Sequence, residues 1–481
     1  MASSSYRAKV VIVGAGASGM AAGTRLLARG FSDFVILESE FRIGGRIQTV
    51  KFDDITVDLG AQYCHGQLGN VVYEMANAFL LLESSVKWSN MFYALSSGQM
   101  LDYQVGEKLL SACVNIVEEA KKHPAGPSES LGDFMTHHFQ KYIQTEDNKD
   151  LCWNFLDWFQ RFENAIDGSD SWFNTSLKGN NEYKDCEGNP TLNWKTVGYS
   201  RIFDIMMKKF PNPALLIPVE PRVHVGKEVY RIEWDRGQHE PATIYCSDGS
   251  KYLAEKVLVT VSLGALKERH LRLFNPQLPQ QKQIAIKGLA FGTVNKILLK
   301  FSEVWWPQNI AGFSFIWTKS DAAVFKKTYA NNDRKRWLLD LFGIYQYYGQ
   351  RNVMCGWVVG DSARLMEKCS DSEVQAGCQE LLQRFLGGSY QIPPIQSILR
   401  SNWYSNENFK GSYSYRDLNS EQLEASASQL AAPVVNSRGE EELLFAGEAT
   451  HEHYFSTVHG AIETGWREAD RILTYFSNVQ Q

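Results

Sequence analysis

Three glycines spaced as GxGxxG follow an apolar segment near the start of the chain. Gly14, Gly16 and Gly19 come directly after KVVIV and open an alanine-rich stretch typical of a helix. Gly14 permits a tight turn, Gly16 lets the backbone approach a pyrophosphate, and Gly19 allows close helix–strand packing. Glu38 ends the next apolar segment, about 20 residues on, where a carboxylate binds ribose hydroxyls. This order of features predicts a dinucleotide-binding unit rather than a structural turn.

A second glycine pair follows this acid. Gly44 and Gly45 precede Arg46, and together they offer backbone room and a guanidinium for a second phosphate contact. A plain NAD-binding unit does not need this feature, so it favours FAD over NAD. The alternative is an ordinary loop with an arginine at the surface.

Two further side chains have types that handle protons or amines. Lys296 lies in KILLKF among apolar residues, a pattern that also fits a lysine whose stem covers a strand face while its ammonium reaches water. His65 follows a short strand in GAQYCHG, where a structural hydrogen bond is the ordinary role of a histidine. The residues alone leave both alternatives open.

The elements that must position these residues alternate along the chain. We expect helices between residues 70 and 173, strands over 215–263 and 287–301, and a helix over SEVQAGCQELLQRFL. The region from LLFAGEAT onward has the pattern of strand, loop and helix. A chain of 481 residues is too long for one ordinary core. Strand–helix alternation interrupted by a helical insert therefore predicts two α/β domains whose segments interleave.

Composition excludes several functional classes. Lys and Arg total 49 against 54 Asp and Glu, a net charge of -5, which argues against a nucleic-acid binder. The eight cysteines form no CxxC pair, so neither a disulfide framework nor a metal site is predicted, and a reducing compartment fits best. We find no secretory leader, no apolar run long enough for a bilayer, and no SKL-type ending in YFSNVQQ. We expect a cytoplasmic protein without membrane partners; a peroxisomal location is the alternative.

Six motifs occur in the order and spacing of one enzyme family. They are GAGASGMAA, GGRIQT, VDLGAQYCHG, FGTVNKILLKF, LLFAGEAT and TVHGAIETGWREA. In this combination the chain resembles the flavin-containing amine oxidases over nearly its whole length, and among them the animal-type polyamine oxidases most. The resemblance implies an FAD-binding, Rossmann-like domain made of residues 1–70, 195–290 and 420–481. It implies a substrate-binding domain made of 71–194 and 291–419.

The resemblance also assigns roles to individual residues. Lys296 matches the lysine that binds a water at flavin N5 and assists hydride transfer and reoxidation. His65 matches a histidine of polyamine oxidases that hydrogen-bonds the substrate, although Tyr63 and Cys64 replace the usual Trp-Ile before it. The expected FAD contacts are Gly14, Gly16, Ser18, Gly19, Glu38, Gly45, Arg46, Gly60, Ala61, Val229, Trp403, Gly447, Glu448, Thr457 and Val458.

Four positions bear on the kind of amine. Ser412 lies where monoamine oxidases carry the cysteine that tethers their flavin, so the resemblance implies a non-covalent FAD. Tyr413 matches one wall of the aromatic cage that steers the amine, and Thr457 lies where monoamine oxidases have the second aromatic wall. Glu182, in NNEYKD, lies where related oxidases carry a substrate-binding acid, although short acidic loops are usually solvated surface.

The predicted reaction is oxidation of a C–N bond of spermine, spermidine or their N1-acetyl forms by O2. An aldehyde, a shorter amine and hydrogen peroxide are the products, and no metal is required because the flavin accepts the hydride. The alternatives are a monoamine oxidase, a histone-demethylase-type chromatin protein and a flavin-binding protein without activity. The choice of polyamine, its acetylation and the oligomeric state stay open.

Overall fold

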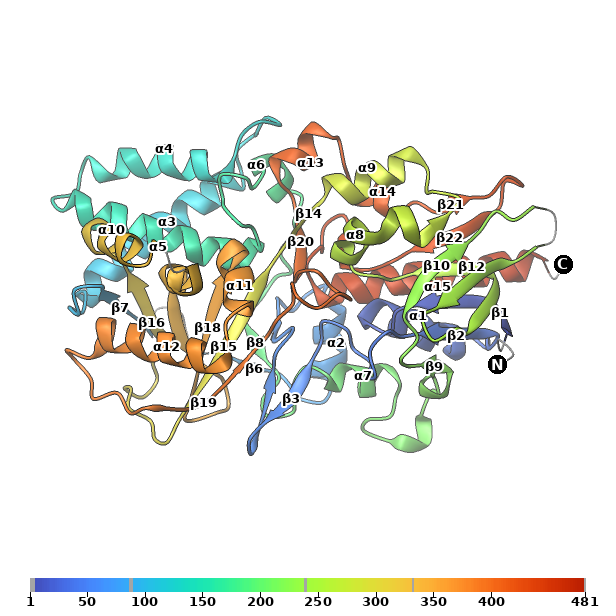
Figure 1. Ribbon diagram of the computed structural model, residues 1–481, viewed down its shortest axis with the longest axis horizontal. Helices are drawn as coiled ribbons and strands as arrows, with labels where there is room; N and C mark the ends of the chain where they lie inside the picture. The colour runs from blue at the N-terminus through green and yellow to red at the C-terminus, as the bar shows by residue number, and fades with distance from the viewer. Residues whose placement is uncertain (1–4, 86–89, 238–239, 331–332, 480–481) are drawn as a thin grey trace.

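The computed structural model describes residues 5–85, 90–237, 240–330 and 333–479. Two sheets lie at opposite ends of the molecule, and both termini lie at the end that holds the larger sheet (Figure 1). Each sheet collects strands from distant parts of the chain, so the chain passes between the two ends several times. The predicted α/β class and the interleaving of segments are confirmed.

The larger sheet has nine strands. In chain order they are β1 (Ser5–Val13), β2 (Phe34–Leu37), β9 (Val223–His224), β10 (Val229–Glu233), β11 (Ala242–Cys246), β12 (Lys251–Val259), β13 (Phe274–Asn275), β21 (Val434–Val435) and β22 (Glu441–Phe445). Their spatial order is β13-β10-β11-β12-β1-β2-β9, with β22 beside β12 and β21 beside β22. β1 pairs in parallel with β12 and β2. Its residues 10–13 are apolar and buried, as expected for a central parallel strand covered on both faces.

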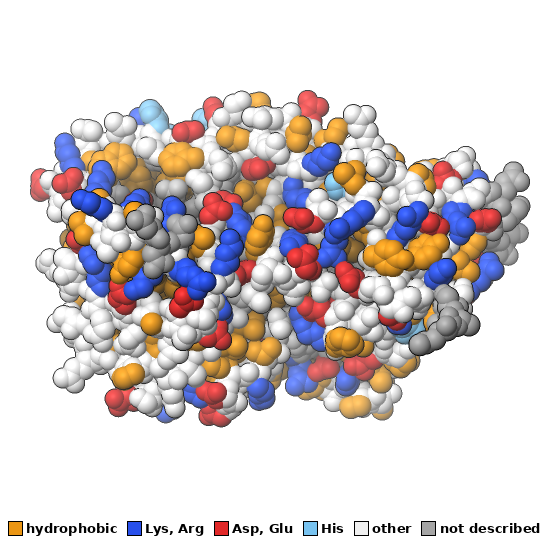
Figure 2. All heavy atoms as spheres, viewed as in Figure 1, with side chains coloured by type: hydrophobic (Ala, Val, Ile, Leu, Met, Phe, Trp, Pro, Cys, Tyr) orange, Lys and Arg blue, Asp and Glu red, His pale blue; other side chains and the backbone are white. Residues whose placement is uncertain are grey.

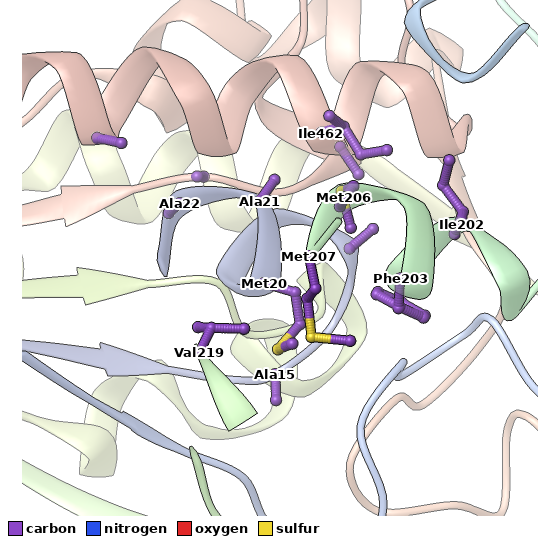
Figure 3. Packing of buried hydrophobic residues seen from close by; sticks show 14 of the residues in the cluster. Ala15, Met20, Ala21, Ala22, Ile202, Phe203, Met206, Met207, Val219 and Ile462 are labelled. Atoms are coloured by element: carbon purple, nitrogen blue, oxygen red, sulfur yellow. The ribbon is translucent and has the colours of Figure 1, made fainter. Parts of the chain in front are cut away.

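Four helices form one core against this sheet: α1 (Ala17–Ala28), α2 (Val71–Asn77), α7 (Arg201–Met206) and α15 (Val458–Val479). Figure 3 shows Met20, Met207 and Ile462 in this contact. Val72 and Ala76 of α2 belong to the same core, although the predicted substrate domain begins at residue 71. The exact domain limits stay a prediction.

The smaller sheet has six strands. In chain order they are β7 (Met91–Leu95), β15 (Val294–Phe301), β16 (Gly312–Ile316), β17 (Gly343–Gln346), β18 (Val353–Val359) and β19 (Ile395–Arg400). β15 lies between β18 and β19, antiparallel to both, and all of its residues are buried. One face of the sheet packs against α3 (Tyr103–Ala120), α4 (Leu131–Ile143) and α5 (Lys149–Asp167). The other face packs against α10 (Lys319–Thr328), α11 (Gly360–Glu367) and α12 (Asp371–Leu386).

Short elements complete the fold. β3 (Thr49–Phe52) pairs with β4 (Ile55–Asp58), β14 (Ala290–Gly292) with β20 (Tyr413–Tyr415), and β5 (Tyr63–Cys64) and β6 (Glu83–Ser84) with β8 (Leu192–Asn193). The remaining α-helices are α6 (Leu177–Asn180), α8 (Leu263–Leu273), α9 (Gln280–Gly288), α13 (Leu418–Gln422) and α14 (Ala427–Ala431).

Basic and acidic side chains are interspersed over the face of the molecule shown in Figure 2. Within the described residues, no helix combines the length and the apolar content that crossing a bilayer requires. The same part of the chain holds no cluster of His, Cys, Asp or Glu side chains arranged as metal ligands.

Candidate active site

One large cavity lies between the two sheets. Its volume is about 1040 Å³, and its wall takes residues from β1, β2 and β10 of the larger sheet and from β15 and β18 of the smaller one. It matches the largest ligand pockets of proteins, which suits a dinucleotide together with a substrate. All of the predicted site residues line it except Gly19 and Glu182.

The glycine motif forms the turn between β1 and α1. Gly14 has a φ of 110°, a value that favours glycine, and Gly16 is the N-cap of α1. A Cβ atom at Gly16 would meet nothing within 4 Å, so this backbone faces open space in the cavity. A Cβ atom at Gly19 would lie 2.0 Å from the carbonyl oxygen of Gly14, so Gly19 packs the helix against the turn. The start of α1 thus has the shape that a phosphate needs at a helix N-terminus.

Glu38 follows β2 beside this turn. Its carboxylate accepts hydrogen bonds from the backbone amides of Ala15 (2.7 Å) and Glu40 (2.8 Å) and from the hydroxyl of Ser39 (3.2 Å). Burial raises the pKa of Glu38, and these hydrogen bonds oppose the shift. The acid is therefore fixed against the glycine turn while it lines the cavity, where ribose hydroxyls would reach it.

Arg46 joins two motifs that lie 402 residues apart. Its Nη1 donates to Glu448 Oε1 at 2.8 Å and to the carbonyl oxygen of Ser412 at 2.8 Å. Nε and Nη2 donate to none of the described residues, so they are available to an anion in the cavity. Gly447 is a further position where an added Cβ would meet nothing within 4 Å. The other predicted cofactor residues in the cavity wall are Ser18, Gly45, Gly60, Ala61, Val229, Trp403 and Val458.

Lys296 reaches the cavity from β15, a buried strand of the smaller sheet. Its Nζ donates to the carbonyl oxygens of Asp58 (3.0 Å) and Gly60 (2.8 Å) and to Gln62 Oε1 (2.8 Å). Lys296 is only 7% exposed, so its ammonium does not reach bulk water as it would on a solvent-facing strand surface. Desolvation lowers the pKa of Lys296, and the nearby Cys355 and Asp58 oppose the shift. Lys296 is therefore a fixed nitrogen whose neutral form is favoured by burial.

His65 lies after β5 and is accessible through the cavity. Its Nδ1 lies 2.8 Å from the carbonyl oxygen of Pro190, which only accepts, so Nδ1 carries the proton. Burial lowers the pKa of His65, which favours the neutral ring. Nε2 is then an acceptor that none of the described residues uses, and it suits the N–H of an amine.

Tyr413 and Thr457 both line the cavity, but only Tyr413 presents an aromatic face. The Tyr413 hydroxyl donates to the carbonyl oxygen of Ala165 at 2.7 Å, and its ring lies against Gly168. Thr457 Oγ1 accepts from the amide of Gly460 and donates to the carbonyl oxygen of Tyr454, so this hydroxyl caps α15. The sequence did not indicate several other aromatic rings of the wall, among them Phe455 and Tyr183, whose centroids are 5.4 Å apart.

Two of the carboxylates that face the cavity come from α5. Glu182 lies outside the cavity wall, its side chain is 45% exposed, and it pairs with Arg416 at 3.1 Å. Glu163 and Asp167, one helical turn apart, line the cavity instead. Glu163 is only 6% exposed, yet it makes no hydrogen bond or ion pair with any described residue. Glu163 is therefore a second candidate for the substrate-binding acid, and the role of Glu182 stays a prediction.

The helical spacing of buried residues in α5 could have indicated that Glu163 is buried. The buried residues Cys152, Leu156 and Phe159 lie at intervals that place Glu163 next on the same face. An acid on an apolar helix face is either paired or functional. Burial raises the pKa of Glu163 and of Asp167, and for Asp167 the charge of Glu163 adds to the shift.

Comparison with known proteins agrees with this geometry. The family model for flavin containing amine oxidoreductase matches residues 17–189 and 211–473. The peroxisomal N(1)-acetyl-spermine/spermidine oxidase of Homo sapiens is 30% identical and aligns with 98% of this chain and 96% of its own length. Probable polyamine oxidase 5 of Arabidopsis thaliana is 27% identical, with 98% and 99% covered.

A solved structure of wild-type putrescine oxidase bound to putrescine has a TM-score of 0.71 with this chain. Its sequence is 16% identical, and the match covers 98% of this chain and 100% of the other, so it demonstrates a shared fold. The cavity, its glycine turn and Glu38 fit FAD, the cofactor of such enzymes. The chain is an amine oxidase that belongs to the flavin-containing amine oxidoreductase family.

Proposed function

We propose that this protein is an FAD-dependent polyamine oxidase. The observation that carries the proposal is Glu163, a buried carboxylate without a partner in the cavity that also holds Lys296 and His65. An unpaired buried carboxylate is costly unless a cation arrives to pair with it. A polyamine supplies such a cation several bonds from the nitrogen that is oxidised, whereas a monoamine does not.

In this proposal the residues of the cavity have distinct roles toward the substrate. Bound FAD would supply the acceptor for a hydride from the carbon next to the nitrogen, with O2 as the final electron acceptor. Tyr413 offers its ring face to the amine, and His65 Nε2 accepts from an amine N–H. In this proposal Lys296, held at the cavity wall by its three hydrogen bonds, exchanges a proton with water in the cavity. Glu163, with Asp167 beside it, holds the distal ammonium.

Two matched variants test this assignment. Glu163→Gln keeps the size of the side chain and removes its charge, so kcat/KM for spermine should fall about ten- to a hundredfold. Glu182→Gln changes an acid that pairs with Arg416 outside the cavity wall, so it should change kcat/KM for spermine by less than about threefold. Benzylamine and tyramine should be poor substrates of all three proteins. Oxidation of these monoamines faster than spermine or N1-acetylspermine by the wild type would overturn the polyamine assignment but leave the amine oxidase family intact.

We propose the cytoplasm as the compartment. All eight cysteines are free, which supports a reducing environment. The human relative is named peroxisomal, so fluorescence microscopy of the tagged protein against a peroxisomal marker is the appropriate test.

A further inference from the structure

Helix α3 has two apolar faces. One face, with Leu109, Cys113 and Ile116, is buried in the core beside the smaller sheet. The other face presents Leu110, Val114 and Val117 to the cavity, at intervals of four and three residues along the helix. Leu110 and Val117 are partly buried against the core, whereas Val114 is 43% exposed, so this second face borders the core and is open to the cavity.

Helix α5 contributes apolar side chains to the same cavity. Phe162 and Ile166 line it, and Ile166 is 59% exposed. These two residues alternate with Glu163 and Asp167, so α5 offers apolar and acidic groups side by side. We call Leu110, Val114, Val117, Phe162 and Ile166 the α3–α5 shelf. Exposed apolar groups gathered in a concave wall are typical of a ligand-binding surface.

The charges beyond the shelf favour an uncharged occupant. Lys121 follows Val117 along the chain and also lines the cavity. It pairs with Asp185 at 3.0 Å and with Glu118 at 3.1 Å. Those two carboxylates are therefore already engaged, and a second substrate ammonium would approach the charge of Lys121. Glu163 and Asp167 make no ion pair among the described residues, so they are the positions that accept an ammonium.

We propose that the α3–α5 shelf binds an uncharged apolar substituent larger than acetyl on a nitrogen of the polyamine. This inference rests on the proposed function and adds the class of substrate: a polyamine with an N-acyl chain of several methylenes. An ammonium group of this substrate pairs with Glu163 and Asp167 of α5. Its acyl chain lies on the apolar side chains of the α3–α5 shelf. The substrate thereby matches the alternation of acid and apolar groups along α5.

The test measures kcat/KM for N1-acetyl-, N1-butanoyl- and N1-hexanoylspermine, which carry the same number of ammonium groups. Burial of one methylene corresponds to about 0.8 kcal/mol, or roughly fourfold in affinity. We expect kcat/KM of the wild type to rise at least about tenfold from acetyl to hexanoyl, since the shelf covers only part of the chain. Val114→Thr and Ile166→Thr preserve shape at the branched carbon and add a hydroxyl. They should reduce this rise to less than about threefold, with activity on N1-acetylspermine little changed.

Val105→Thr is the matched control, because Val105 lies on α3, is 38% exposed and does not line the cavity. It should keep the full dependence on chain length. A flat response of the wild type, with spermine and acetylspermine still oxidised, would refute the shelf and leave the proposed function standing. An equal loss in all three variants would also refute it, whereas failure of every polyamine would refute the proposed function itself.

Discussion

The side-chain nitrogen of Lys296 lies 2.8 Å from the side-chain oxygen of Gln62. This contact ties β15 of the smaller sheet to the segment that leads from β4 to β5. With the carbonyl oxygens of Asp58 and Gly60, it uses all three protons of a lysine ammonium. Loss of a proton therefore frees a lone pair at a nitrogen whose position is already set.

Replacement of Lys296 by methionine should slow flavin turnover while FAD stays bound. The variant removes the fixed nitrogen and should lower the rate of flavin reduction or of reoxidation about 100-fold, a typical contribution of a positioned proton-transfer group. Stopped-flow absorbance under anaerobic and aerobic conditions measures the two rates. Lys300→Met is the control, because Lys300 lies on the same strand but pairs with Asp53 and Asp54. Wild-type rates in both variants would reduce Lys296 to a structural role.

Replacement of Glu163 by glutamine should stabilise the protein only at higher pH. Burial raises the folded-state pKa of Glu163 above the 4.5 of the unfolded chain. The folded state therefore binds the proton more tightly, and this contribution is complete below the unfolded pKa and lost as pH rises through the folded pKa. Thermal unfolding should show a gain of about 1–3 kcal/mol at about pH 8 and none at about pH 4. A gain of equal size at both pH values would contradict an ionised, unpaired Glu163.

Two glycines of the same motif should respond differently to alanine. Gly16→Ala places a methyl group into the cavity, and the φ of -73° accepts alanine, so the fold should persist with reduced flavin content. Gly19→Ala places a methyl group 2.0 Å from the carbonyl oxygen of Gly14 and should cost about 1–3 kcal/mol of stability. Flavin content after gel filtration and melting temperature distinguish the two. Equal melting temperatures for both variants would be inconsistent with these contacts.

The flavin should be released without a covalent bond. The Ser412 hydroxyl, at the position where a tether would form, donates to the carbonyl oxygen of Val294 and accepts from its amide. Acid precipitation should therefore leave a yellow supernatant over a colourless pellet. Colour that remains in the washed pellet would show a covalent link.

The arrangement of the glycine turn and Glu38 was predictable because it depends on local geometry, whereas their contacts with FAD stay a prediction. Gly14, Gly16 and Glu38 are set by one strand–helix–strand unit, and their spacing along the chain fixes their arrangement. The position of Glu182 outside the cavity wall was not predictable, because it lies in a loop and its partner Arg416 is 234 residues away in the sequence. The position of Glu163 in the wall was not predicted because aromatic residues dominate the pattern of α5, and only the neighbouring sheet decides which face of the helix meets the cavity.

The hydrogen bond between Arg46 and Glu448 also constrains how the protein is made. The ribosome completes the first glycine turn early, but Glu448 is synthesised 402 residues after Arg46. Until β22 and α15 emerge, the nascent larger sheet lacks the strand beside β12 and the helix packed on α1. A chain truncated before residue 441 would thus expose the apolar face of α1 and lack part of the cavity wall, so flavin capture must wait for synthesis of these two elements.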